Sequence, residues 1–342
     1  MTAHDYYKNK KILVTGGVGS IGNQLVRKLL TLDPKIIRVF DNNETGLFDL
    51  EQELNTKKIR ILIGDIRDKD RLVMAMDGID IVFHTSALKH VPICEFNPFD
   101  AVKTNVLGTQ NVLEAALINN VQKFINVSTD KAVNPTNVMG ATKLLAERLT
   151  ISANHYTGNK RTKLSSVRFG NVLNSRGSVI PLFKKQILSG GPVTITDKDM
   201  TRFIMDIPTA ADLIIAAGEL AEGREVFILK MPALKIIDLA QVMIHDLSLT
   251  HGFNPKDIKI QFIGKRSGEK LYEELMSEAE TFRALENDDM YIILPEMLPF
   301  EKPLEYHMAK IFKKTTISNF SSENARLISK KEISILLKKF DN

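Results

Sequence analysis

A glycine-rich turn near the start of the chain constrains the fold more than any other feature. The apolar segment 11–14 (KILV) runs into TGGVGSIG, and the helical pattern NQLVRKLLTL follows. Glycines at 16, 19 and 22 allow a tight turn, a close approach of the backbone to a phosphate, and close contact between helix and strand. The N–H groups at the helix N-terminus then face that phosphate. We therefore expect a dinucleotide pyrophosphate to bind at Gly16, Gly19, Ser20, Ile21 and Gly22.

A second apolar segment, 36–40, ends at Asp41, nineteen residues after Gly22. A carboxylate at this place accepts hydrogen bonds from both hydroxyls of the dinucleotide ribose, and it would repel a 2′-phosphate. The three residues that follow Asp41 include no basic side chain to accommodate such a phosphate. We therefore predict NAD, not NADP, as the cofactor. The alternative is that Asp41 is an ordinary turn residue.

Apolar strands continue to alternate with helical patterns along the first half of the chain. The strand at 59–65 ends at Asp65-Ile66, expected beside the adenine, and the strand at 80–87 ends at Ala87, expected near the nicotinamide. This alternation predicts an α/β fold: a Rossmann-type doubly wound parallel sheet with a smaller C-terminal α/β substrate domain. We assign the NAD-binding domain to 1–172 plus about 203–230, the substrate-binding domain to about 173–202 and 231–300, and a C-terminal tail to 301–342.

Polar residues follow the strand at 80–87 in the sequence HTSALKH (84–90). A position over the cofactor favours a site role for His84, Lys89 and His90, although His84 could cap the strand and Lys89 could be solvated. We expect no metal ion here, because no carboxylate or cysteine stands at ligand spacing. Asn105 lies in a helical segment and would need a partner if buried. We place it beside the cofactor, positioning the loop at 128–131.

The stretch 126–143, NVSTDKAVNPTNVMGATK, brings Thr129, Asp130 and Lys131 together at the end of an apolar strand, and Lys143 follows twelve positions after Lys131. Because buried charges must be paired, this group of hydroxyl, carboxylate and ammonium favours proton transfer. The alternative is a helix N-cap, where Thr and Asp are preferred. Met139 lies four positions before Lys143, where a tyrosine would complete a familiar oxidoreductase signature.

By these motifs the chain resembles the extended short-chain dehydrogenase/reductase superfamily, and within it the CapD-like polysaccharide-biosynthesis branch, which includes UDP-N-acetylglucosamine 4,6-dehydratases. The resemblance runs from residue 11 to about 275 and rests on TGGVGSIG, HTSALKHVP, STDKAVNPTNVMGATK, VRFGNVLNSRGSVIPLF, ITDKDMTRFIM and GKRSGEKLYEEL. The sequence departs from the branch at Thr85 and Ser86, where alanines are usual, and at Ser267, where proline is usual. No charged group is lost, so the implied substrate class is unchanged.

The resemblance implies a reaction in which NAD is a catalyst. Hydride leaves carbon four of the sugar, the resulting ketone acidifies the proton on carbon five, water leaves from carbon six, and the hydride returns there. Asp130 would protonate the departing hydroxyl. Lys131, with a pKa lowered by burial and by Lys143, would take the proton from carbon five. Thr129 would bind the four-oxygen, and Lys143 would hold the nicotinamide ribose.

Met139 leaves the base of the first oxidation unassigned, because a thioether neither accepts nor donates the hydroxyl proton. Methionine at this position is a variant within the branch that the chain resembles. We expect Asp130, acting through Thr129 or a water, to take that proton. We therefore assign proton transfer to the pair Asp130 and Lys131 instead of residue 139. This assignment favours dehydration.

The resemblance also implies a UDP-sugar site, with UDP-N-acetylglucosamine or a related UDP-N-acetylhexosamine as substrate. Asn171, Ser178 and Val179 would approach the diphosphate. Arginines would face phosphate and ribose, because the planar guanidinium donates hydrogen bonds in pairs. The alternative for either arginine is a surface salt bridge. The remaining residues expected at the substrate are Lys89, His90, Arg202, Arg266 and Glu269.

Composition excludes several classes of protein. The net charge of +5 is mild, and acids interspersed with the Lys and Arg residues argue against a nucleic-acid partner. The single cysteine, Cys94, fits a reducing compartment. The sequence has neither a signal-peptide core nor eighteen consecutive apolar residues, so we predict a cytoplasmic protein without a membrane span. By resemblance we expect a homo-oligomer, either a dimer or a hexamer.

Two C-terminal segments carry structural expectations. LYEEL (271–275) has its apolar residues on one side of a helical pattern and is predicted to be a helix. Ile333, Leu336 and Leu337 form an apolar stripe on a basic helix, which is typical of a core or subunit contact; a membrane-surface role is a weaker alternative.

The sequence is compatible with three functions. The first is a UDP-N-acetylhexosamine 4,6-dehydratase, with or without inversion at carbon five. The second is a 4-epimerase of the same substrates, which usually relies on the tyrosine that is missing at position 139. The third is a catalytically silent nucleotide-sugar-binding protein, which Met139 motivates and the retained Asp130, Lys131 and Lys143 oppose.

Overall fold

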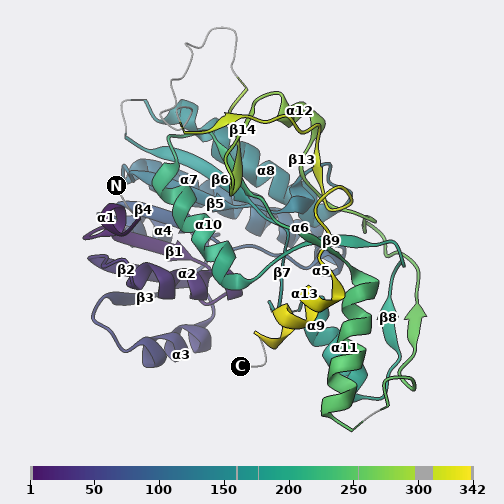
Figure 1. The fold of residues 1–342 in the computed structure, drawn as a ribbon. Helices are drawn as coiled ribbons and strands as arrows, with labels where there is room; N and C mark the ends of the chain where they lie inside the picture. Colours follow the sequence, from purple (N-terminus) through teal and green to yellow (C-terminus); the bar gives the residue numbers. More distant parts are fainter. Residues whose placement is uncertain (1–2, 159–160, 176, 253, 297–310, 340–342) are drawn as a thin grey trace.

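The computed structural model describes residues 3–158, 161–175, 177–252, 254–296 and 311–339. Its centre is a ten-stranded sheet with the order β16-β14-β15-β10-β6-β5-β4-β1-β2-β3 (Figure 1). Neighbouring strands from β10 to β3 are all parallel, as the predicted Rossmann-type sheet requires. The parallel strands are β1 (Lys11–Thr15), β2 (Ile36–Asp41), β3 (Ile59–Ile63), β4 (Ile81–His84), β5 (Lys123–Val127), β6 (Lys163–Arg168) and β10 (Val226–Leu229).

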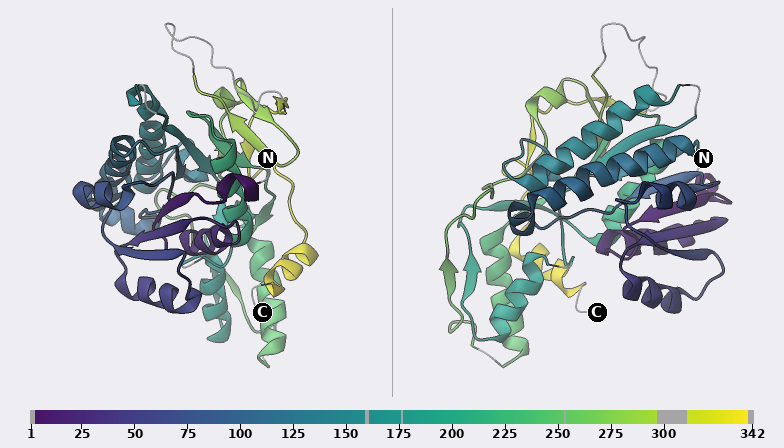
Figure 2. Two further views of the ribbon diagram at one scale, coloured as in Figure 1. Left: turned by 90° about the vertical axis from the view of Figure 1, so that its left-hand side faces the viewer. Right: turned by 180° about the vertical axis from the view of Figure 1, so that it is seen from behind.

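Helices cover both faces of this sheet, so its central strands are apolar on both sides. Along β1, Ile12 and Val14 pack in one apolar cluster and Leu13 in another, which follows from the alternation of side chains along a strand. The first cluster includes α2 (Ser20–Leu30), α3 (Glu44–Leu54) and α10 (Ile207–Leu220). The second includes α4 (Lys69–Met76), α7 (Thr109–Ile118) and α8 (Val138–Ser152), which Figure 2 shows from behind.

One edge of the large sheet is antiparallel and comes from C-terminal residues. β15 (Met290–Ile293) pairs with β10, β14 (Ala284–Glu286) pairs with β15, and β16 (Lys313–Lys314) pairs with β14. The division into domains remains a prediction, but residues 284–293 lie in the large sheet and not in a separate substrate-binding unit, because Ile292 and Ile293 are buried in the core around β10.

A third apolar cluster, separate from the two of the large sheet, holds α9 (Val179–Leu188), α11 (Ile236–Thr250) and α13 (Lys330–Lys338) together. Two short parallel strands, β8 (Val193–Ile195) and β12 (Ile260–Phe262), pack with them. Ile333 is buried in this cluster, and Leu336 and Leu337 pack against it. The expected apolar stripe is therefore a core contact of α13.

The predicted helix at LYEEL is wrong. β13 (Glu274–Met276) is extended because it pairs antiparallel with β17 (Phe320–Ser321), a partner that local sequence does not reveal.

None of the described helices is long and apolar enough to cross a membrane. The remaining elements are α1 (Ala3–Tyr7), α5 (Val91–Phe96), α6 (Pro98–Ala101), the π-helical η1 (Val102–Gly108), the 3₁₀ turns η2 (Asp130–Ala132) and η3 (Ala153–Tyr156), β7 (Asn171–Val172), β9 (Thr201–Met205), β11 (Ala233–Lys235) and α12 (Glu278–Thr281).

Candidate active site

Two adjoining cavities lie at the carboxyl ends of the parallel strands. Their volumes are about 510 and 390 Å³, and they share wall residues where β1 and β4 end, so they form one continuous cleft. Ligands of doubly wound sheets bind at this edge. The shared residues are Gly16, Gly19, Thr85, Ala87 and Leu88.

The glycine-rich turn forms the floor between the two cavities. Gly16 has a φ of +70°, and a Cβ there would lie 2.7 Å from the backbone nitrogen of Ser86. A Cβ at Gly22 would lie 2.2 Å from the carbonyl oxygen of Gly16, so helix α2 can approach the turn only with glycine at this position. Gly19 caps α2 without a side-chain hydrogen bond, and Ser20 and Ile21 also line the larger cavity. This cradle fits a pyrophosphate.

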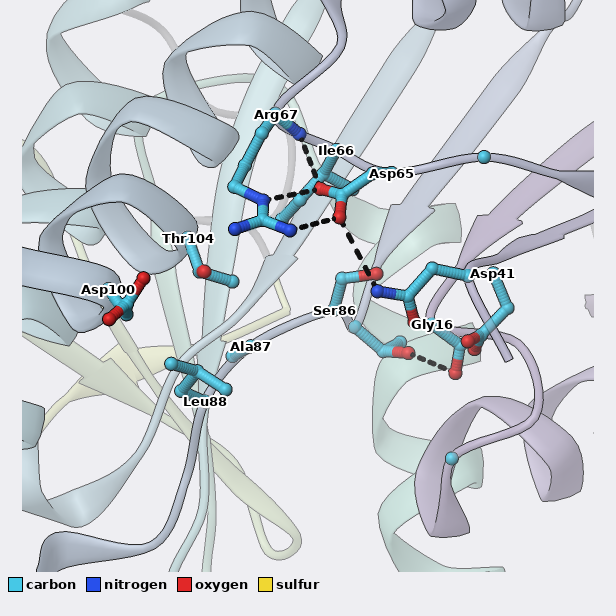
Figure 3. A pocket seen from close by; sticks show the side chains of 14 residues that line it. Gly16, Asp41, Asp65, Ile66, Arg67, Ser86, Ala87, Leu88, Asp100 and Thr104 are labelled. Atoms are coloured by element: carbon cyan, nitrogen blue, oxygen red, sulfur yellow. Dashed lines mark hydrogen bonds and ion pairs between the residues drawn. The ribbon is translucent and has the colours of Figure 1, made fainter. Parts of the chain in front are cut away.

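The smaller cavity is lined by the acidic residues that the sequence predicts for the adenosine half of the cofactor. Asp41 is fixed at the end of β2, because its carboxylate accepts hydrogen bonds from Val18 N at 3.2 Å and Asn43 N at 3.0 Å. Asp65 and Ile66, which are predicted to lie beside the adenine, line the same cavity (Figure 3). Arg67, which sequence reasoning missed, also lines it and holds Asp65 through hydrogen bonds of 3.0 and 2.6 Å. The hydrogen bonds from Arg67 lower the pKa of the Asp65 carboxyl.

The loop after β5 brings the predicted proton-transfer residues together. Asp130 is fully buried, and its Oδ1 accepts hydrogen bonds from Thr129 Oγ1 and from Lys131 Nζ, both at 2.9 Å. Its Oδ2 is buried without a partner. Thr129 and Lys131 line the larger cavity. Thr129 is also the N-cap of η2, because its Oγ1 accepts a 3.4 Å hydrogen bond from Lys131 N.

The expected lowering of the Lys131 pKa is wrong. Burial by itself lowers that pKa, but the negative charges of Asp130 and Glu273 outweigh burial and raise it. Glu273 Oε1 lies 3.6 Å from Lys131 Nζ. Sequence reasoning missed Glu273 because it lies in LYEEL, where a helical pattern gave no indication of contact with the loop after β5.

The lysine with a lowered pKa is Lys143 of α8. Burial lowers its pKa to about 8, and the charge of Glu147 only partly opposes this. Lys143 Nζ donates a 2.5 Å hydrogen bond to the carbonyl oxygen of Val127, and both residues line the larger cavity. Met139 lies one helical turn earlier, also on the cavity wall, and packs with Cys94 and Ala101. The position expected of a tyrosine hydroxyl is thus apolar.

In the HTSALKH segment, the first histidine is buried in the core, whereas the lysine and the second histidine line the larger cavity. A site role was predicted for His84, but this side chain is buried, and its two ring nitrogens form hydrogen bonds with Thr15 Oγ1 at 2.7 Å and with Thr109 Oγ1 at 3.0 Å. Burial lowers its pKa to about 3, so the ring is neutral. Lys89 and His90 line the larger cavity, and their contacts with cofactor or substrate remain predictions.

Asn105 does not hold the loop at 128–131 through any hydrogen bond of its side chain. It accepts from Leu88 N at 2.8 Å and donates to Leu88 O and Thr142 Oγ1, both at 3.0 Å. It therefore fixes the segment after β4 against α8. It lines neither of the two cavities, which differs from the predicted cofactor contact.

Of the three residues expected at the substrate diphosphate, Asn171 and Ser178 line the larger cavity and Val179 does not. Asn171 lines it and accepts a 3.3 Å hydrogen bond from Lys131 Nζ. Ser178 is the N-cap of α9, and Val179 begins that helix. The Ser178 hydroxyl also lines the cavity and is buried without a hydrogen-bond partner. This helix start offers N–H groups to an anion in the cavity.

The predicted arginine contacts are not those of the structure. Arg202 is buried and donates to the carbonyl oxygens of Thr201 (2.7 Å), Leu271 (3.0 Å) and Lys270 (2.8 Å), so its guanidinium is committed to the chain and not directed at a phosphate. Arg266 is exposed, and its backbone nitrogen donates to Glu269 at 3.2 Å. Neither Arg266 nor Glu269 lines the two cavities. Within the described residues, no group of three or more His, Cys, Asp or Glu side chains could hold a metal ion.

Comparison with known proteins shows relatives that match almost the whole chain. An uncharacterized membrane protein of Methanocaldococcus jannaschii is 56% identical and is aligned over 98% of this chain and 97% of its own. A UDP-N-acetylglucosamine 4,6-dehydratase (inverting) of Campylobacter jejuni is 38% identical over 96% and 97%. A UDP-glucose 4-epimerase of Rickettsia rickettsii is 41% identical over 98% and 97%. The chain spans about half the length of the capsular polysaccharide biosynthesis protein CapD of Staphylococcus aureus, with 49% identity.

The structure agrees with these matches. The crystal structure of Pen from Bacillus thuringiensis is similar with a TM-score of 0.89, 44% identity and 98% of both chains covered. Residues 12–295 match the family described as polysaccharide biosynthesis protein, which is the family expected from the sequence motifs. The family match covers most of the chain, and the sheet has the expected topology. The chain therefore belongs to the polysaccharide biosynthesis protein family.

Proposed function

We propose that the protein is an NAD-dependent UDP-N-acetylglucosamine 4,6-dehydratase that makes a UDP-4-keto-6-deoxy-N-acetylhexosamine for polysaccharide biosynthesis. The observation that carries this proposal is the contact of Lys131 with Asp130 at 2.9 Å, since Lys131 lines the same cavity as the glycine-rich turn. Elimination of water needs one group that takes a proton and one that gives a proton. An ammonium on a carboxylate holds one mobile proton between them. Its transfer gives a neutral amine and a carboxylic acid, which are the required base and acid.

The chain's residues support this assignment of roles. Gly16, Gly19 and Asp41 would hold NAD, which supplies a hydride acceptor and donor when bound. Lys143 adds a positive charge beside the carboxyl end of β5. The start of α9 at Ser178 would bind the UDP diphosphate, which leaves the sugar next to Thr129 and Lys131 on the wall of the same cavity. A homo-oligomer, whether dimer or hexamer, remains a prediction.

Incubation with UDP-N-acetylglucosamine in deuterated water, followed by NMR of the sugar, tests the proposal. We expect a 4-keto-6-deoxy product that carries solvent deuterium at carbon five, because Lys131 exchanges its proton with water between steps. Absence of turnover by protein that contains bound NAD would instead indicate a catalytically silent nucleotide-sugar-binding protein.

The second candidate is a UDP-N-acetylhexosamine 4-epimerase, which the similarity to the Rickettsia epimerase favours. Such a reaction needs no proton transfer at carbon five. Conversion to the galacto sugar without deuterium would therefore replace the dehydratase proposal with this one. The apolar Met139 at the tyrosine position and the Lys131–Asp130 pair weigh against it.

Asp41 gives a prediction about cofactor choice. Asp41→Asn removes the negative charge that would accept from the ribose hydroxyls and repel a 2′-phosphate. Since a hydrogen bond to a charged group is worth about 1.5–3 kcal/mol, we expect NAD to bind roughly tenfold or more weakly. Calorimetric titration of cofactor-free protein with NAD and NADP measures the change. Asp49→Asn, at an exposed position of α3, is the control and should leave both affinities unchanged. Equal NAD affinity in Asp41→Asn would remove the assignment.

A further inference from the structure

Glu273 is held in place by segments that lie far apart in the chain. Its backbone nitrogen donates to Ser322 Oγ at 3.0 Å, and its carbonyl oxygen accepts from Ser322 N at 2.8 Å. Ser322 Oγ also lies 2.9 Å from the hydroxyl of Thr201 in β9. Residues after β17 and residues in β9 thus fix the position of Glu273, although neither segment lines the cavity.

The Glu273 side chain is buried against the pair proposed to transfer protons. It is 4% exposed; Oε1 lies 3.6 Å from Lys131 Nζ and 4.0 Å from Arg202 Nε, and Oε2 is buried without a partner. Lys131 therefore lies within reach of two carboxylates, since Asp130 contacts it at 2.9 Å. The charged groups that act on Glu273 are Lys131, Asp130, Arg202 and Lys270.

We propose that Glu273 is a positioning residue that sets the charge of Lys131, so that its own protonation decides whether the amine is available as a base. An ionised Glu273 adds a second negative charge and holds Lys131 as an ammonium. A protonated Glu273 leaves one carboxylate, Asp130, and the single proton of the pair can then pass from Lys131 to Asp130. No proton is gained or lost by the pair in that transfer. The inference rests on the proposed function for its catalytic meaning.

The state of Glu273 itself is consistent with this role. Burial raises its pKa, and Asp130 raises it further, while the positive charges of Lys131, Arg202 and Lys270 oppose the change. An unpartnered buried Oε2 is also the atom on which a proton would reside without breaking any contact.

Glu273→Gln tests the inference, because the amide keeps the shape of the side chain without its charge. The readout is the pH dependence of acetic anhydride labelling of Lys131, followed by mass spectrometry of the peptide, since only the free amine reacts. An opposite charge at this range shifts a pKa by about 1–3 units, so the labelling midpoint should fall by that much. In the pH profile of kcat/KM, the part that depends on deprotonation of Lys131 should also shift to lower pH.

Glu274→Gln is the matched control. Glu274 is the adjacent carboxylate, but it accepts from Asn134 Nδ2 at 2.8 Å and lies 3.9 Å from Lys270, so the Lys131 midpoint should not change. An unchanged midpoint in folded Glu273→Gln would overturn the inference. Ser322→Ala keeps the carboxylate and loosens its position, and we expect a smaller shift in the same direction. Labelling needs no turnover, so an inactive wild-type protein would refute the proposed function and still leave this inference tested.

Discussion

Replacement of Lys131 by alanine is expected to abolish formation of the 4-keto-6-deoxy sugar while NAD still co-purifies with the protein. The variant removes the group that takes the proton from carbon five and leaves the glycine-rich turn intact. General acid–base groups contribute about 10²–10⁴ in rate, so the residual rate should fall by at least that factor. NMR of the product and absorbance of the released cofactor measure the two quantities separately.

The control for this variant is Lys123→Ala. Lys123 lies at the start of β5, at the opposite end of the strand from the cavity, and its Nζ donates to Glu219 O. Lys123 is partly buried, as Lys131 is, but it does not line the cleft. Its loss should change stability and not the reaction. A Lys131→Ala enzyme that still dehydrates its substrate would remove Lys131 as the base.

Replacement of Arg168 by methionine is expected to give the largest loss of stability. Arg168, at the end of β6, is buried and donates to Glu147 of α8 (2.8 and 2.5 Å), to Glu280 of α12 (2.9 and 2.7 Å) and to Leu275 O. Its removal leaves two buried carboxylates without a cation. Loss of one partner of a buried pair costs about 3–5 kcal/mol, which urea unfolding at pH 7 would measure. Activity should fall with it, because Leu275 adjoins the segment that carries Glu273.

Arg27→Met is the control for Arg168→Met. Arg27 pairs with Glu53, but the two side chains are 31% and 60% exposed, so the expected loss is below about 1 kcal/mol. Similar losses in the two variants would contradict the role of the buried network. Addition of Glu147→Gln and Glu280→Gln to Arg168→Met should recover part of the stability, because the uncompensated charges are then gone.

The same network predicts a pH dependence. Burial alone would raise the pKa of Glu280, but the charge and hydrogen bonds of Arg168 lower it from 4.5 to about 2. A carboxyl whose pKa is lower in the folded state stabilises that state above its unfolded pKa. This contribution is present above pH 4.5 and is lost as the pH falls through about 2. Arg168→Met should lack this part of the acid dependence in unfolding curves.

Much of the architecture and of the cofactor half of the cleft could be predicted from local sequence. The glycine spacing from Gly16 to Gly22, the apolar strands and the acid at Asp41 act within one βαβ unit, so their geometry follows from residues close in the chain. Thr129, Asp130 and Lys131 are adjacent in sequence and were therefore found together. Gly16 has a positive φ, and a glycine at this position of the sequence already indicated such a tight turn.

Other features depended on contacts between distant segments, and only the tertiary structure decided them. Asp130 and Glu273 raise the pKa of Lys131, which burial alone would lower, and Glu273 directly precedes β13, which pairs with β17. Arg202 is bound by carbonyl groups of residues 270 and 271, and Arg67 occupies a cavity beside Asp65.

The amino-acid sequence by itself determined the fold class and the family, and it placed the two residues of the proposed proton-transfer pair side by side, because each of these features is encoded by side chains within a few positions of one another. The protonation of that pair was decided by the tertiary structure. A pKa depends on which charges lie within a few ångströms and on how much water is excluded. For Lys131, the charge of Asp130 raises the pKa most and the charge of Glu273 adds to it; hydrogen bonds with Ser322 fix Glu273 close to the lysine.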